Sequence, residues 1–217
     1  MFQRLVTGAA IAGFAAGLTA AALHLLAVQP LLLLAETFET AGHAHTHATT
    51  AAHDHAAPAV GLMRNALTVL FFALTYAGFG LLLAAAMALR PGPRTWRQGM
   101  IWGLAGFAAF QFAPAFGLPP APPGLEPGAL APRQLWWFAT VALTAGGLWL
   151  LAFRRDGWAL AGVALIALPH LGLAPAPVIA ESALPGAVVA AFVARTLAVG
   201  AVGWAVLGAL TASLARD

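Results

Sequence analysis

Long apolar runs separated by short polar segments dominate the amino-acid sequence. A helix needs roughly 20 apolar residues to cross a bilayer core. The fifth such run is short and contains Pro169, so an arrangement of five spans with this run re-entrant stays open beside the preferred six. The pattern predicts an all-α integral membrane protein in which residues 1–217 form one helical domain, with spans at 5–33, 66–89, 99–118, 135–153, 158–174 and 186–210.

The arginines between the apolar runs predict how the helices are oriented. Cytoplasmic loops of membrane proteins carry an excess of Lys and Arg. Seven of the ten arginines fall on one side of the predicted array, whereas Arg64 and Arg133 fall on the other and Arg195 lies inside the last run. We therefore expect both termini in the cytoplasm of a bacterium, with segments 35–63 and 119–134 on the outer side of its inner membrane. The second of these segments is rich in proline and is expected to be a stiff cap.

Composition narrows the class of protein further. The chain is 61% hydrophobic and 8% charged, whereas soluble domains are usually about 25% charged. A soluble domain is therefore excluded, and the arginines at span ends indicate topology rather than nucleic-acid binding. There is no cysteine, which excludes disulfides, thiolate metal sites and iron–sulfur clusters. Any metal must be held by imidazole, carboxylate, thioether or backbone oxygen.

Metal-binding side chains are concentrated between the first two runs. Five of the seven histidines lie there, on a segment composed otherwise mainly of Ala, Thr and Gly. Imidazoles at this spacing can converge on one ion at the entropic cost of ordering the segment. Neutral imidazole suits the divalent ions of Co, Ni, Cu and Zn. A solvated segment that binds metal only incidentally, or a pH sensor, are the alternatives. Glu36 lies in the same segment, and the candidate ligands are Glu39, His43, His45, His47, His53, Asp54 and His55.

Two further histidines lie inside the predicted spans. His24 is in the outer half of the first span, before a break expected near Pro30. His170 follows Pro169, which cannot donate the hydrogen bond to the carbonyl of Leu165. An ionisable group at membrane depth is by default a functional candidate, so both histidines are predicted to lie on a metal pathway. The alternative is an imidazole that is hydrogen-bonded within the bundle.

Other polar residues at membrane depth are weaker candidates. Gln111, together with Pro114, is the counterpart of the Pro169 break in another predicted span. Arg195 must snorkel, pair or face water, and we expect a structural ion pair with Glu181, its nearest acidic neighbour in the sequence. Glu126 is expected to be solvated, although it could add a carboxylate to a metal entrance.

Taken together, these motifs resemble the CbtA family of cobalt transporter subunits. The resemblance runs almost end to end and implies cobalt as the transported substrate, with no prosthetic group. It also implies a partner, the small single-span protein CbtB, which bears histidines of its own. No P-loop is present, so the energy source stays open. The matching features are Met1-Phe2-x-Arg4-Leu5, the His-rich segment closing at Gly61 and Arg64, Phe112-x-Pro114, Leu118-Pro119-Pro120, Arg133-Gln134-x-Trp136-Trp137, Pro169-His170, Gly172 and Pro175-Ala176-Pro177.

These features predict a membrane permease subunit for Co²⁺ or Ni²⁺ that collects the ion on the outer segment and passes it toward His24 and His170. One alternative is a membrane-anchored metal-binding or chaperone subunit that serves another transporter without conducting. An exporter is another, because the sequence gives no direction. An intramembrane metalloenzyme is disfavoured, since no H-E-x-x-H pair or catalytic carboxylate cluster lies in any span. The sequence does not fix the oligomeric state.

Overall fold

The described part of the chain is entirely helical in its regular structure. The computed structural model describes residues 2–43, 57–90, 95–125, 128–175 and 184–214. Within these residues, four helices are long and apolar enough to cross a membrane. The all-α prediction is confirmed, whereas the count of six spans and the side on which the termini lie stay predictions. The four helices are α1 (Phe2–Ala27), α3 (Ala57–Ala88), α6 (Leu130–Phe153) and α8 (Gly186–Leu214).

The other apolar runs form shorter or interrupted helices. The first run breaks after α1 and continues as α2 (Gln29–His43). The third run begins as α4 (Trp96–Phe107), passes through a π-helical segment, η1 (Ala108–Phe112), and ends in the short α5 (Ala113–Ala115). The fifth run forms α7 (Trp158–Ala167) and a 3₁₀ turn, η2 (Leu168–His170). The breaks predicted near Pro30 and Pro169 are therefore present, as expected where a proline removes a backbone donor.

Helices extend into both segments that are predicted to lie outside the membrane. Helix α2 extends into segment 35–63 as far as His43, and α3 begins within it at Ala57. Helix α6 likewise begins at Leu130, inside the predicted segment 119–134. Polar residues such as Glu36 and Arg64 were assigned to a loop on hydropathy, although both are good helix formers. Hydropathy thus underestimated how far the helices extend beyond the apolar runs.

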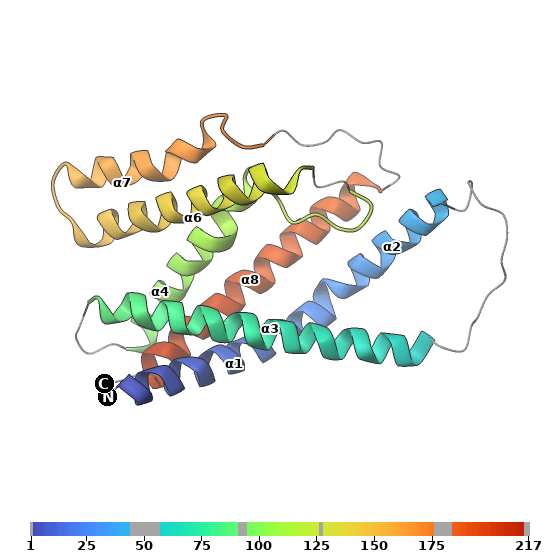
Figure 1. Cartoon of the computed structure of the whole chain (residues 1–217), viewed down its shortest axis with the longest axis horizontal. Helices are drawn as coiled ribbons and strands as arrows, with labels where there is room; N and C mark the ends of the chain where they lie inside the picture. Colours follow the sequence, from blue (N-terminus) through green and yellow to red (C-terminus); the bar gives the residue numbers. More distant parts are fainter. Residues whose placement is uncertain (1, 44–56, 91–94, 126–127, 176–183, 215–217) are drawn as a thin grey trace.

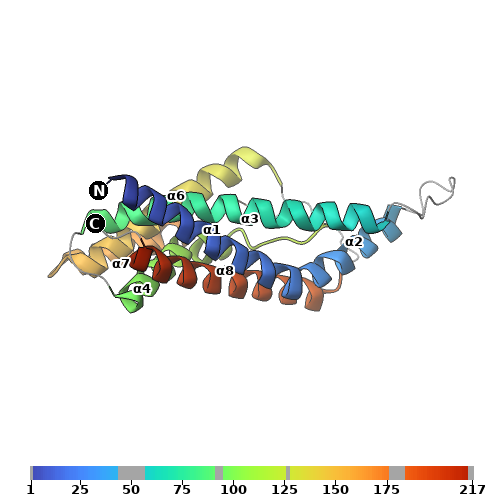
Figure 2. The same ribbon diagram turned by 90° about the horizontal axis from the view of Figure 1, so that it is seen from below.

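Helices α1, α3, α6 and α7 run broadly along the long axis of the molecule, whereas α2, α4 and α8 cross it obliquely (Figure 1). Helix α3 runs antiparallel beside α1, α8 packs against both α1 and α4, and α6 pairs with α7 at one edge. The two chain ends lie together at one end of the molecule, near the C-terminal end of α3 and the start of α4, and the view from below agrees (Figure 2). We call this the termini end. The last turn of α2 and the first turn of α3 lie at the opposite end.

Small residues allow the central helices to approach closely. Within membranes, helix association relies on close backbone packing at Gly and Ala rather than on burial from water. A Cβ added at Gly103 on α4 would collide with the carbonyl oxygen of Trp204 on α8, and one at Gly13 on α1 would collide with that of Tyr76 on α3. Trp204 and Tyr76 are themselves buried in the core. These contacts fix α1, α3, α4 and α8 as the frame on which the candidate site is built.

Candidate metal-entry site

The break between α1 and α2 is closed by an arginine from the last helix. In a continuous α-helix the amide of Leu31 would donate to the carbonyl of Ala27. Here it donates to the carbonyl of Val28 instead, so the carbonyl of Ala27 lacks its usual helical donor. Arg195 Nη1 on α8 donates to this oxygen at 3.0 Å. The ion pair that the sequence suggested with Glu181 falls outside the described residues, and the observed partner of Arg195 is a backbone carbonyl.

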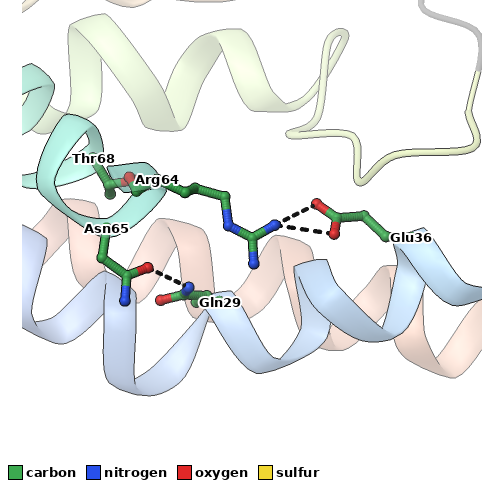
Figure 3. A network of polar contacts seen from close by, with 5 residues as sticks. All are labelled: Gln29, Glu36, Arg64, Asn65 and Thr68. Carbon is green, nitrogen blue, oxygen red and sulfur yellow. Dashed lines mark hydrogen bonds and ion pairs between the residues drawn. The ribbon is translucent and has the colours of Figure 1, made fainter. Parts of the chain in front are cut away.

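Two polar pairs join α2 to α3 (Figure 3). Arg64 Nη1 lies 3.2 and 3.1 Å from the two carboxylate oxygens of Glu36. Gln29 Nε2 donates to Asn65 Oδ1 at 2.7 Å. We call these four residues the α2–α3 latch. Glu36 lies about two turns before the end of α2, and Arg64 about two turns after the start of α3, so the latch joins the two helices that flank the histidine-rich segment.

Most of the predicted metal ligands lie outside the described residues. This is so for His45, His47, His53, Asp54 and His55. Glu39 and His43 belong to α2, and His43 is its last residue, but the positions of their side chains are not described. Among the residues that are described, no group of three or more His, Asp or Glu side chains could hold a metal ion. Metal binding by this segment therefore stays a prediction.

His24 is placed on α1 among aromatic side chains. Its ring is half-buried and lies 5.1 Å, centroid to centroid, from the ring of Phe72 on α3. Its backbone carbonyl accepts the amide of Val28 at 2.9 Å, immediately before the break. A contact with an aromatic ring satisfies neither imidazole nitrogen, so His24 keeps the capacity to bind an ion or a proton.

His170 lies in a separate part of the molecule. It is exposed in η2, with its ring edge-on to Phe116 at 5.8 Å and to Trp136 at 6.2 Å. Trp136 Nε1 donates to the carbonyl of Pro169 at 3.1 Å, which ties the 3₁₀ turn to α6. Helix α7 and η2 pack against α6, and neither contacts α1. The structure therefore does not bring His170 and His24 together.

Two cavities meet at the π-helical segment. The first, which we call the proline cavity, has a volume of about 950 Å³ and lies between residues 118–125, η1, α6 and α8. The second, the aromatic cavity, has a volume of about 470 Å³ and extends past Trp102 and Trp149 to Arg90, near the termini end. Phe110 lines both cavities.

Phe110 is held in this position by other aromatic rings. Its ring centroid is 5.3 Å from Phe79, 5.5 Å from Trp204 and 6.1 Å from Trp137. These partners come from α3, α8 and α6, respectively, so the ring is surrounded from three helices. Phe110 is therefore a packed side chain that belongs to the walls of both cavities. Hydropathy did not single out this residue, because a phenylalanine within an apolar run carries no distinguishing signal.

Comparison with known proteins gives one match that covers nearly the whole chain. A family model described as probable cobalt transporter subunit (CbtA) matches residues 2–216. No curated protein and no solved structure matches. Together with four helices of sufficient length and apolar character, the match makes the chain a multi-pass membrane protein. The description as a subunit implies that it works with a partner.

Proposed function

We propose a function that starts from an established fact: the chain belongs to the CbtA family of probable cobalt transporter subunits. In this proposal the chain is a permease subunit that takes up Co²⁺, or Ni²⁺, across the inner membrane of a bacterium. The histidine-rich segment lies on the outer side, collects the ion and delivers it to a route between the helices. A small single-span subunit of the CbtB type, with histidines of its own, is the expected partner.

The observation that carries this proposal is the α2–α3 latch at the base of the histidine-rich segment. Arg64 and Glu36, together with Gln29 and Asn65, bridge the two flanking helices through their side chains, while the helix backbones stay apart. A bridge between the two flanking helices restricts where the ends of the segment can lie, so less conformational entropy is lost when several of its imidazoles converge on one ion. The latch would also keep the bound ion near the end of the bundle instead of letting it diffuse on a free tail.

The cavities support a route beyond the latch. An ion that leaves the histidine-rich segment would meet His24 beside the break between α1 and α2. It would then pass the proline and aromatic cavities, which share Phe110 in their linings. Irregular backbone at membrane depth is tolerated where it is buried in protein or lines a cavity. The π-helical segment lines the proline cavity, so it meets this condition.

One observation favours the second candidate function, a subunit that binds metal and hands it to another transporter without conducting. The described helices hold no group of three metal-binding side chains, and the described lining of both cavities contains neither His nor a carboxylate. Shedding the hydration shell of a divalent ion requires protein ligands, so a bare ion would find few along this route. An exporter would use the same features in the opposite direction.

Cobalt accumulation in cells tests the proposal. Cells expressing the chain with its single-span partner should contain more cobalt than cells with the partner alone. Replacing the five histidines of 43–55 by Ala should remove the gain. Replacing Thr46, Thr49 and Thr50 of the same segment by Ala is the matched control and should leave the gain intact. Equal cobalt content in cells with and without the chain, both proteins being present in the membrane, would refute uptake.

A further inference from the structure

The proline cavity contains a positive charge and several polar side chains within an otherwise apolar lining. Gln111 comes from η1, Arg133 and Gln134 from the first turns of α6, and Thr196 from α8. No Asp or Glu is among its described lining residues. At about 950 Å³ the cavity is large enough for a small organic molecule, since ligand pockets usually measure roughly 300–1,000 Å³.

Two buried polar atoms in this cavity have no protein partner. Arg133 Nε and Thr196 Oγ1 are both inaccessible to solvent and make no hydrogen bond to any described residue. Buried polar groups in folded proteins are nearly always hydrogen-bonded. Arg133 Nε and Thr196 Oγ1 are two of seven such side-chain atoms among the described residues, and since both residues line the cavity, a rotation of either side chain would bring its polar atom to a molecule bound there.

A third polar group, Gln111, has a fixed place in the same wall. Its amide oxygen lies directly over Gly200 on α8, where a Cβ would collide with it. Gln111 belongs to η1, and π-helical segments inside α-helices are frequent at functional sites. Its side-chain amide can donate hydrogen bonds as well as accept them, so Gln111 can bind the same polar group as Arg133.

The electrostatics of the cavity select an anion. Arginine stays protonated in proteins and presents a planar fork of donors that matches a carboxylate. Arg133 lies in the first turn of α6, where the helix dipole adds partial positive charge and exposed N–H groups attract anions. A bare divalent cation is repelled from the surroundings of Arg133, so an ion that crosses this cavity in the proposed uptake route must pass along its other wall or as an anionic chelate.

We propose that the proline cavity is a binding site for a small carboxylate anion, held by Arg133 with Thr196 and Gln111. The ligand is either a free carboxylate or the carboxylate chelate of a divalent metal, since both present the same group to the arginine. The site uses none of the histidines, so it goes beyond the proposed metal capture and can hold or fail independently of it.

Calorimetric titration of the purified full-length chain in lipid nanodiscs tests this site, with citrate, cobalt(II) citrate and cobalt(II) chloride as probes. Citrate, its cobalt chelate or both should bind. Arg133→Gln should weaken that binding about tenfold or more, as expected for loss of a charge-assisted bidentate contact, and Arg133→Lys should recover part of it. Arg155→Gln, an exposed charge between α6 and α7, is the matched control and should bind like the wild type.

The comparison between probes identifies the ligand. In the chain lacking the five histidines of 43–55, binding of the chelate alone assigns the site to the metal complex, whereas binding of citrate with and without cobalt assigns it to the free anion. Thr196→Val keeps the shape of the side chain and removes the hydroxyl, so it should weaken citrate binding by a smaller factor than Arg133→Gln. It provides the test of the site if Arg133→Gln fails to fold. No binding of either citrate probe, or equal losses in the Arg133 and Arg155 variants, would overturn the proposal. A chain lacking the five histidines of 43–55 should still bind citrate, so failure of metal capture and failure of this site remain distinguishable.

Discussion

Substitution of Gly103 by Ala should destabilise the bundle, although the same change normally stabilises a helix. Gly103 lies in α4 at the crossing with α8, where a Cβ would collide with the carbonyl oxygen of Trp204. Because the obstacle is backbone, it cannot rotate away. Overpacking of this kind costs about 1–3 kcal/mol, and the gain in helix propensity of Ala over Gly returns only about 0.8–1.0 kcal/mol. Since the carbonyl is part of a packed helix, the cost lies at the upper end of that range, and we expect a net loss of about 2 kcal/mol of unfolding free energy.

Gly78 provides the matched control within the same bundle. It lies in α3, and a Cβ added there would have no other atom within 4 Å. Gly78→Ala should therefore gain about 0.5–1 kcal/mol from helix propensity alone. Equilibrium unfolding of the two variants in mixed detergent micelles, followed by circular dichroism, should move in opposite directions. If Gly103→Ala were as stable as the wild type, α4 and α8 would not cross at Gly103 and the walls of both cavities would have to be redrawn.

Three other predictions concern the metal route. Phe110→Ala should raise cobalt leakage into vesicles, because it removes the ring that lines both cavities. Phe71→Ala, on an exposed face of α3, should not raise it. Equal leakage in the two variants would refute a barrier at Phe110. Glu36→Gln and Arg64→Gln should each change the free energy of unfolding by less than about 1 kcal/mol, because the pair is half-exposed. Their double-mutant cycle should show coupling between the two side chains. Purely additive effects would mean that the pair does not form. Cobalt binding by the purified chain should weaken as the pH falls from about 7 to about 5, since imidazole must be deprotonated to bind metal. If the same pH dependence of cobalt binding remained after the histidines in 43–55 were replaced, other residues would be the ligands.

The helical elements were predictable because lipid imposes a simple rule. Long apolar runs identified α1, α3, α6 and α8, and the prolines at 30 and 169 identified where the helices break. A missing backbone donor acts locally, so its effect can be read from the sequence without knowing the fold. The helices extend further than predicted at α2 and α3, where polar residues continue a helix beyond the apolar run.

The polar contacts of the site were not predictable, because they join residues far apart in the chain. Sequence proximity points to Glu181, which lies outside the described residues, as a partner of Arg195, and it gives no sign of the contact with the carbonyl of Ala27, 168 positions away. The latch between Arg64 and Glu36 likewise depends on how α2 and α3 come together. The π-helical segment was missed for a related reason, since the position of Phe110 reflects packing against rings from three other helices.

Cobalt entry into sealed vesicles tests the central claim most directly. The chain and a small histidine-bearing single-span partner would be reconstituted together, with radioactive cobalt supplied outside and a chelator trapped inside. A permease subunit predicts cobalt accumulation in the lumen that requires this chain and falls when the five histidines of 43–55 are replaced by Ala. Cobalt that binds to the vesicles through those histidines but never reaches the trapped chelator would contradict transport and leave a metal-delivery subunit.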